Sequence, residues 1–178
     1  MTKSTDGSTS TVDSNKGMRV KDNYLSEKDH QTLYNGVTSS YFPLFFNSFK
    51  TAEDDPNLED FQFVHNFYDS FSRNSTAFNL VAPLVKKLNP KSLVRIKLNL
   101  NPYSQKLIVG TYHQDQPFKC KGAIYYLNTN NGYTLFKKGE KKIKSVKNRI
   151  VFFEANESHL GTNSTDCKNR LVLNFNYF

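Results

Sequence analysis

The sequence of 178 residues contains no tryptophan and only two cysteines. Cys120 and Cys167 are too few for the disulfide framework of a small secreted protein, so we expect two reduced thiols in a cytoplasmic protein. No apolar run is long enough to cross a bilayer, and the N-terminus lacks the apolar stretch of a secretory signal. These absences exclude disulfide-stapled domains and predict no membrane partner.

Basic residues exceed acidic ones by a net charge of +8, and much of this excess lies in residues 137–149. Two interpretations fit this segment. It is either a surface that binds nucleic acid or another acidic partner, or a solvated hairpin whose lysines discourage edge-to-edge strand pairing. No aromatic residue is interleaved with the lysines as base stacking would require, so the hairpin is favoured and nucleic acid is not expected as a partner.

The chain divides by composition into a polar leader and one domain. Residues 1–17 are too polar to bury a core and are expected to be a disordered tail or an appended leader. Residues 18–178 are expected to form a single domain, with helical support in 18–92 and a β core in 93–178. Within the support, capping and periodicity predict helices from Ser26 to near Ser39 and over 82–88.

Short alternating segments dominate the rest of the sequence and make the fold class mainly β. One strand is predicted near Phe61–Tyr68. Eight more follow it, at Leu93–Leu100, Lys106–His113, Gly122–Leu127, Tyr133–Phe136, Lys142–Val146, Arg149–Glu154, His159–Gly161 and Arg170–Tyr177. Eight strands with few helices favour a double-stranded β-helix, or jelly roll, in which two sheets enclose a central cavity. The N-terminal helices are expected to pack on the outside of one sheet.

Four residues in this β region carry the chemistry. His113 and Asp115 form a His-x-Asp pair, whose side chains leave the same face of a strand. His159 opens the seventh strand of the set, which neighbours the second in a jelly roll. Two imidazoles and one carboxylate suit Fe(II) and leave coordination positions open. Arg170 opens the eighth strand and offers a planar fork for a carboxylate.

Each of these residues also has a plainer interpretation. In that interpretation, the two histidines are hydrogen-bonded core side chains that bind no metal, and Arg170 is a structural ion-pair partner. His65 is expected to be a packed or hydrogen-bonded histidine, and His30 to lie on a solvated helix face. The order of the four residues along the predicted strands favours the metal site.

The stretch Leu93–Phe178 resembles the catalytic core of the 2-oxoglutarate- and Fe(II)-dependent dioxygenases, in the prolyl 4-hydroxylase-like branch. Besides the metal residues, the resemblance rests on Ala-Ile-Tyr-Tyr-Leu-Asn at 123–128, Asn-Arg-Ile-Val-Phe-Phe at 148–153 and Arg-Leu-Val-Leu-Asn-Phe at 170–175. It implies that His113, Asp115 and His159 hold Fe(II). Halogenating members of the fold lack the carboxylate ligand, so the presence of Asp115 implies hydroxylation.

The resemblance also implies a binding site for the cosubstrate. Arg170 would pair with the distal carboxylate of 2-oxoglutarate, and Tyr126 would donate a hydrogen bond to the same group. Ile124 would flank the cosubstrate, Asn174 would add a polar contact, and Tyr103 lies near the place of another tyrosine of the family. The sequence departs from the family at 132–134, where Gly-Tyr-Thr replaces the common Gly-Gly-Glu-Thr.

The resulting hypothesis is an enzyme that uses O2 and 2-oxoglutarate, with ascorbate as an auxiliary reductant, and releases succinate and CO2. Its expected substrate is a prolyl residue in a peptide or protein, or a related small molecule. Two rivals stay open: a catalytically inactive jelly-roll module that binds an acidic partner through 137–149, and a cupin-type metalloenzyme without a cosubstrate. The loops expected to select the substrate, at 51–60, 101–106 and 128–133, carry no recognisable motif.

Overall fold

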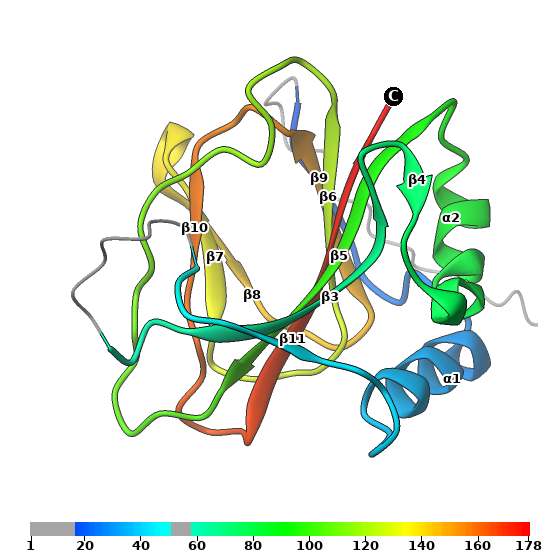
Figure 1. Cartoon of the computed structure of the whole chain (residues 1–178). Coiled ribbons are helices and arrows are strands. Elements are labelled where there is room, and N and C mark those ends of the chain that lie inside the picture. Colours follow the sequence, from blue (N-terminus) through cyan, green and yellow to red (C-terminus); the bar gives the residue numbers. More distant parts are fainter. Residues whose placement is uncertain (1–16, 51–57) are drawn as a thin grey trace, which may run out of the picture.

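Two antiparallel β-sheets and two α-helices make up the computed structural model, which describes residues 17–50 and 58–178 (Figure 1). The predicted tail, apart from Gly17, and most of the predicted loop at 51–60 lie outside the described residues. Within the described part of the chain, neither helix has the length and apolar character needed to cross a membrane. The mainly β fold class and the jelly-roll arrangement are confirmed.

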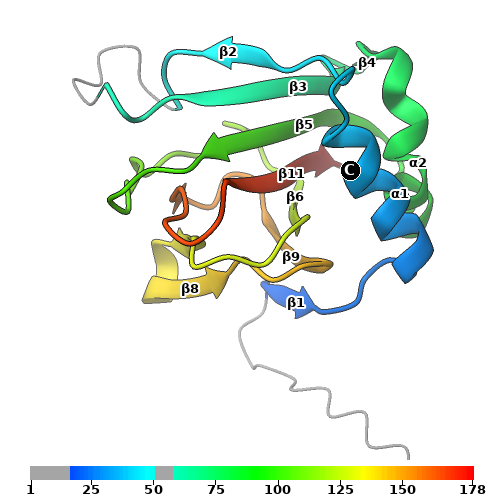
Figure 2. The same ribbon diagram turned by 90° about the horizontal axis from the view of Figure 1, so that it is seen from below.

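The large sheet has eight strands in the order β1-β9-β6-β11-β5-β3-β2, with β4 paired to β3. Their bounds are β1 Arg19–Lys21, β2 Phe45–Asn47, β3 Gln62–Asp69, β4 Ser72–Arg73, β5 Leu93–Pro102, β6 Lys121–Tyr126, β9 Arg149–Glu154 and β11 Asn169–Tyr177. The small sheet has the order β10-β7-β8, formed by β7 Tyr133–Phe136, β8 Lys141–Lys144 and β10 His159–Gly161. Figure 2 shows β2 and β3 at the end of the large sheet farthest from β8.

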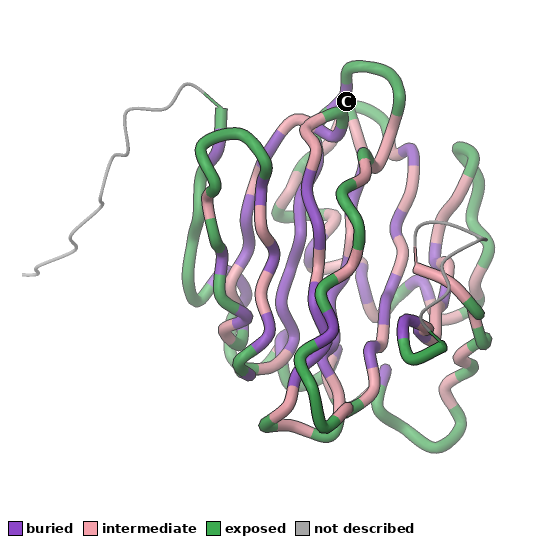
Figure 3. Tube along the Cα trace, turned by 90° about the vertical axis from the view of Figure 1, so that its left-hand side faces the viewer, coloured by how far each residue is buried: buried purple, intermediate pink, exposed green. Residues whose placement is uncertain are grey.

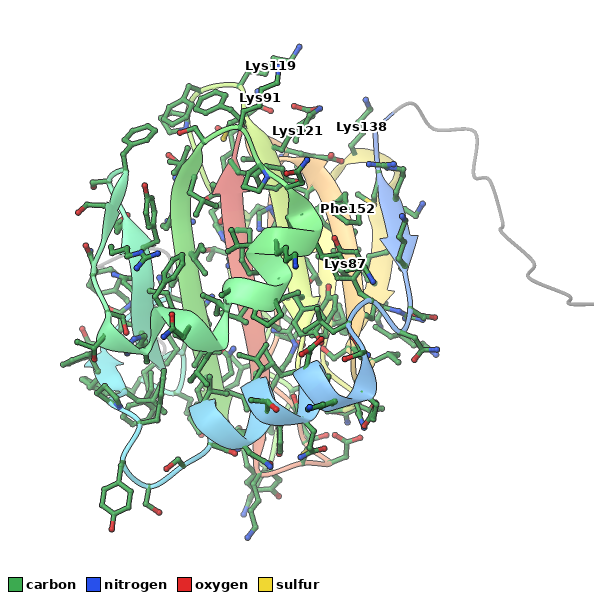
Figure 4. The ribbon with its side chains drawn as sticks, turned by 90° about the vertical axis from the view of Figure 1, so that its right-hand side faces the viewer. Lys87, Lys91, Lys119, Lys121, Lys138 and Phe152 are labelled. Carbon is green, nitrogen blue, oxygen red and sulfur yellow. The ribbon has the colours of Figure 1, made fainter. Side chains whose placement is uncertain are left out.

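Both helices cover one face of the large sheet, as expected (Figure 4). Helix α1, Glu27–Val37, begins at Ser26, whose hydroxyl accepts a hydrogen bond from the amide of Asp29 at 3.1 Å. Helix α2, Ala82–Leu88, follows the 3-10 helix Thr76–Leu80 and ends at Asn89, which adopts a left-handed conformation. Their apolar side chains join those of the sheet in one core cluster.

Strand β5 shows how the alternation of the sequence creates two different faces. Ile96 and Leu98 are fully buried in the core beneath the helices. The intervening residues Arg95, Lys97 and Asn99 project to the opposite face, because successive side chains of a strand alternate. Figure 3 shows the strands of the sheet buried over much of their length while the connecting loops are exposed. The polar face of β5 therefore lies inside the molecule, between the two sheets.

One predicted strand is not a strand. The segment Lys106–His113 makes only isolated bridges, between Val109 and Thr162 and between His113 and His159. The amide of Ile108 is bound by the side-chain oxygen of Asn163, at 2.8 Å, in place of a backbone carbonyl. A side chain therefore interrupts the regular ladder, and the segment follows β10 as an irregular edge.

The expectation that His30 lies on a solvated helix face is wrong, because its side chain is only 1% exposed. Leu33 and Val37 follow His30 at intervals of three and seven residues, so all three occupy the apolar face of α1. The His30 Nδ1 is 2.6 Å from the hydroxyl of Tyr125. Burial lowers the pKa of His30 below its ordinary value. This histidine is a hydrogen-bonded core residue. So is His65, as expected, whose two ring nitrogens form hydrogen bonds with the carbonyl of Pro43 and the hydroxyl of Ser75.

Candidate metal centre and active-site cleft

His113, Asp115 and His159 converge between the two sheets. One ligand atom from each residue lies within 4.8 Å of the others, the spacing needed to hold one metal ion. The backbones of His113 and His159 exchange two hydrogen bonds of 2.9 Å, so the two residues are direct neighbours on adjacent segments. Their rings lie 4.7 Å apart between centroids. The predicted convergence is present in the structure.

Both imidazoles are oriented as metal ligands. The Nδ1 of His159 lies 2.9 Å from the carbonyl oxygen of Glu157, and that of His113 lies 3.2 Å from the carbonyl oxygen of Thr111. A carbonyl only accepts, so each Nδ1 carries the hydrogen and each Nε2 keeps its lone pair for a metal. Burial, together with the proximity of His159, lowers the pKa of His113 and favours the neutral form that binds metals.

The carboxylate of Asp115 is held from two sides by residues that the sequence analysis missed. Its Oδ1 accepts a hydrogen bond from Arg95 Nη2 at 3.0 Å, and its Oδ2 accepts one from Asn176 Nδ2 at 3.2 Å. Arg95 and Asn176 are paired residues on β5 and β11. The side-chain amide of Gln116 in turn donates a hydrogen bond to Asn176 Oδ1 at 3.2 Å. These contacts aim the carboxylate at the two histidines.

Replacing Arg95 by methionine should weaken metal binding by roughly 10- to 100-fold, the usual cost of losing a partner that orients a ligand. Calorimetric titration of the metal-free protein with Mn(II) measures this change. Lys121→Met is the matched control, because Lys121 pairs with Glu154 at the exposed rim of the sheet (Figure 4) and does not line the cleft. Equal affinities for the two variants would show that Arg95 does not position Asp115.

Arg170 is buried at the wall of the same cleft, with a side chain only 3% exposed. Its guanidinium donates to Ser145 Oγ at 2.8 Å, to the carbonyl of Thr162 at 3.1 Å and to Thr134 Oγ1 at 3.1 Å. These bonds use three of its five N–H groups. Burial lowers its pKa, yet a guanidinium stays charged at neutral pH. Among the described residues, no carboxylate forms an ion pair with Arg170. The structure thus presents a buried cation with donors to spare, which suits a carboxylate ligand.

Tyr126 does not line the cleft as the resemblance implies. Its ring is fully buried and its hydroxyl donates to Thr134 Oγ1 at 2.9 Å. Thr134 therefore accepts hydrogen bonds from both Tyr126 and Arg170, which leaves its own hydroxyl hydrogen free to point into the cleft. Thr134 belongs to the Gly-Tyr-Thr segment that departs from the family. Thr134 lines the cleft, and Tyr126 reaches the cleft only through its hydrogen bond to Thr134.

The other three predicted cosubstrate residues lie in different places. Ile124 and Asn174 both line the cleft, Ile124 as a buried apolar wall and Asn174 with a buried side-chain oxygen that has no hydrogen-bond partner. Tyr103 is 54% exposed and lines a separate surface pocket, not this cleft.

The cleft is lined by residues of both sheets. Further polar residues line it, among them Lys50, Gln62, Lys97, Asn99 and Asn101. The signal for three of them was present in β5, because the alternation that buries Ile96 and Leu98 places Lys97, Asn99 and Asn101 on the opposite face. These side chains face a cleft only because the small sheet covers that face of the large sheet. Alternation within one strand does not reveal this covering.

Comparison with solved structures shows what this fold is similar to. A prolyl hydroxylase from Trichoplax adhaerens, in complex with a peptide fragment of the hypoxia inducible factor oxygen degradation domain, matches with a TM-score of 0.61 and 14% identity over 91% of this chain and 83% of that chain. The 2OG complex of a viral collagen prolyl hydroxylase from Paramecium bursaria Chlorella virus-1 matches with a TM-score of 0.61 and 15% identity over 90% and 95%.

A third similar structure is the non-heme alpha ketoglutarate dependent epimerase SnoN from nogalamycin biosynthesis, with a TM-score of 0.62 and 15% identity over 91% of this chain and 77% of that chain. No family model matches the sequence, and no curated protein matches it. At these identities the similarity shows the fold. The chain has the jelly-roll fold of prolyl hydroxylases and other 2OG-Fe(II) oxygenases.

Proposed function

We propose that this protein is an Fe(II)- and 2-oxoglutarate-dependent dioxygenase that hydroxylates its substrate in a prolyl 4-hydroxylase-like reaction. The observation that carries the proposal is the shared cleft, where the triad of His113, Asp115 and His159 faces the same space as the buried guanidinium of Arg170. The fold of the similar structures supports it. The proposed substrate is a prolyl residue of a peptide or a related small molecule.

The residues present fit both the metal and the cosubstrate. When bound, Fe(II) with 2-oxoglutarate and O2 supplies the oxidising chemistry that hydroxylates the substrate and yields succinate and CO2. The two Nε2 atoms and the Asp115 carboxylate would hold the metal on one side and leave its other positions open. Arg170 would bind the distal carboxylate of the cosubstrate through its spare N–H groups, and the Thr134 hydroxyl would donate to it.

Apolar side chains complete the site. Ile124 and Val172 line the cleft from neighbouring strands of the large sheet, and Phe136 and Phe153 pack against His159 with ring centroids 5.4 and 5.1 Å from it. These contacts keep water from the wall behind the histidine and fix its ring. The presence of Asp115 as a carboxylate ligand supports hydroxylation over halogenation, for which a ligand position must be vacant.

The rival function, a binding module that uses the basic segment 137–149, is less well supported. Lys147 forms an ion pair with Glu27, and Arg149 pairs with Asp22 at 2.6 Å. The ammonium of Lys142 lies 3.7 Å from the ring centroid of Tyr133. Part of the basic charge is thus neutralised or engaged within the chain. Strand β8 is an edge of the small sheet, where lysines discourage pairing with another chain.

Two further expectations belong to the proposal. Residues 18–178 would act as one domain, which is supported by a core cluster that joins Leu33 of α1 to Leu98 and Phe175 of the sheet. Activity would take place in the cytoplasm, where the free thiols Cys120 and Cys167 stay reduced.

A substrate screen tests the proposed function. The protein is incubated with Fe(II), 2-oxoglutarate, O2 and ascorbate against prolyl peptides and small metabolites, with succinate measured and products examined for the mass of one added oxygen. We expect succinate in proportion to hydroxylated product, and none in chelator-treated protein. The binding module would instead be favoured by three results together: no succinate from any candidate, no binding of 2-oxoglutarate, and binding to polyanions that weakens steeply with salt.

A further inference from the structure

A polar row crosses the floor of the cleft beside the metal triad. Lys97 on β5 is paired with Asn66 on β3 and with Asn174 on β11. Paired residues of antiparallel strands project to the same face with their side chains adjacent, so these three lie side by side. Asn99, two residues along β5, projects to the same face, and Lys97, Asn99 and Asn174 all line the cleft. The row lies on the part of the sheet that continues through β3 to β2 (Figure 2).

Lys97 is a cation of this cleft that the mechanism above does not use. Among the described residues it forms no hydrogen bond and no ion pair, whereas Lys50 pairs with Asp60 and Arg95 pairs with Asp115. Burial lowers the pKa of Lys97, and the charge of Arg95 lowers it further, while Asp115 and Asp69 act in the opposite direction. An anion bound next to Lys97 would compensate its buried charge and would offset its repulsion from Arg95.

Hydrogen-bond acceptors without partners surround this lysine. The side-chain oxygens of Asn66, Asn99 and Asn174 are all buried and have no hydrogen-bond partner among the described residues. Asn99 as a whole is only 8% exposed. A buried polar atom without a partner is costly, so three of them in one row indicate a ligand that supplies N–H or O–H donors.

We propose that the substrate is anchored on this row by a carboxylate, which binds Lys97, and by N–H or O–H donors, which bind the side-chain oxygens of Asn99 and Asn174. The inference rests on the proposed function and specifies its substrate class. The matching chemistry is that of an amino acid with a free carboxylate, present either as a free small molecule or as the C-terminal residue of a peptide. A prolyl residue in the middle of a peptide offers no such carboxylate.

Charge and position agree with this assignment. Fe(II) and the 2-oxoglutarate dianion carry opposite charges of equal size, so their binding leaves the charge of Lys97 uncompensated. Arg170, near the start of β11 and opposite Asn101, is the cation assigned to the cosubstrate. Lys97 is two residues from Arg95, which contacts Asp115, so a carboxylate on Lys97 would lie next to the metal centre. The substrate would therefore be held by its acid group close to the carbon that reacts.

Paramagnetic line broadening tests the inference without requiring turnover. Mn(II) replaces Fe(II) in the full-length protein, 2-oxoglutarate is added, and the proton resonances of each probe are recorded. The probes are the standard L-amino acids, their primary amides, and glycyl-L-proline with a free or an amidated C-terminus. We expect at least one acid to be broadened and its amide to bind at least about tenfold more weakly, as the loss of a charge-assisted hydrogen bond predicts.

The variant Lys97→Met should reduce binding of that acid by roughly 10- to 100-fold, to the level of its amide, and leave binding of the amide unchanged. Lys97→Arg should restore part of the affinity, and the surface control Lys121→Met should have no effect. Free amino acids and C-terminal peptides are distinguished by which probe responds.

Three results would overturn the inference: equal binding of acid and amide, unchanged binding in Lys97→Met, or no broadening of any acid while 2-oxoglutarate is broadened. If 2-oxoglutarate itself is not broadened in the unaltered protein, the proposed function fails, and this inference fails with it. The resonances of the cosubstrate in the same sample therefore separate the two failures.

Discussion

Replacing His113 by alanine is expected to abolish stoichiometric Fe(II) binding and, with it, the formation of succinate. The variant removes one of three atoms that converge within 4.8 Å, and the remaining pair cannot hold the metal on one face. The loss should exceed the roughly 10- to 100-fold that removal of an orienting partner costs. Calorimetric titration with Fe(II) under anaerobic conditions measures the binding, and succinate formation measures the activity.

Tyr112→Ala is the matched control for this prediction. Tyr112 is adjacent in sequence and 42% exposed, and its ring lies beneath the ammonium of Lys137 and not on the cleft. The backbone hydrogen bonds between residues 113 and 159 do not involve the imidazole, so His113→Ala should keep the fold, which circular dichroism checks. Unchanged Fe(II) affinity in a folded His113→Ala protein would contradict the assignment of this ligand.

Replacing Arg170 by leucine should weaken binding of 2-oxoglutarate by roughly 30- to 4,000-fold, because truncating one partner of a buried, hydrogen-bonded charge pair costs about 2–5 kcal/mol. Affinity for the metal alone should change little, since Arg170 does not contact the triad. Anaerobic titration of the Fe(II)-loaded protein with 2-oxoglutarate measures the effect. The KM for 2-oxoglutarate should rise correspondingly in turnover.

Arg170 also binds Ser145, Thr162 and Thr134, so its loss affects the cleft wall as well as the ligand. Arg170→Lys keeps the charge without the planar fork and should fall between the leucine variant and the unaltered protein. Arg149→Leu controls for the removal of an arginine that pairs with a surface aspartate. A metalloenzyme without a cosubstrate predicts instead that turnover survives Arg170→Leu unchanged.

Local sequence patterns predicted most of the secondary structure because each pattern has a direct physical cause. The helix over 82–88 has the predicted bounds, since Pro83 suits a first turn and Asn89-Pro90 ends it. The strand at Arg149–Glu154 was also predicted with its observed bounds. The segment Lys106–His113 was not, because the side chain of Asn163, distant in sequence, takes one of its backbone amides.

The metal triad was predictable because a spacing of two residues on a strand places His113 and Asp115 on one face. The resemblance places Tyr126 on the cleft, whereas in the structure its hydroxyl reaches Thr134, and only the packing of the small sheet on the large one decides that contact. The position of Lys97 on the cleft was missed for a related reason. Alternation shows that one face of β5 is polar, but it does not show that a second sheet covers that face and makes it the floor of a cleft.

The central claim is that His113, Asp115 and His159 hold one ferrous ion within reach of a cosubstrate anchored by Arg170. An anaerobic optical titration tests it most directly. Adding 2-oxoglutarate to the Fe(II)-loaded protein should produce a visible charge-transfer band that saturates at one cosubstrate per chain and is absent from His113→Ala. A folded, Fe(II)-treated protein that shows no band at saturating 2-oxoglutarate would contradict the claim.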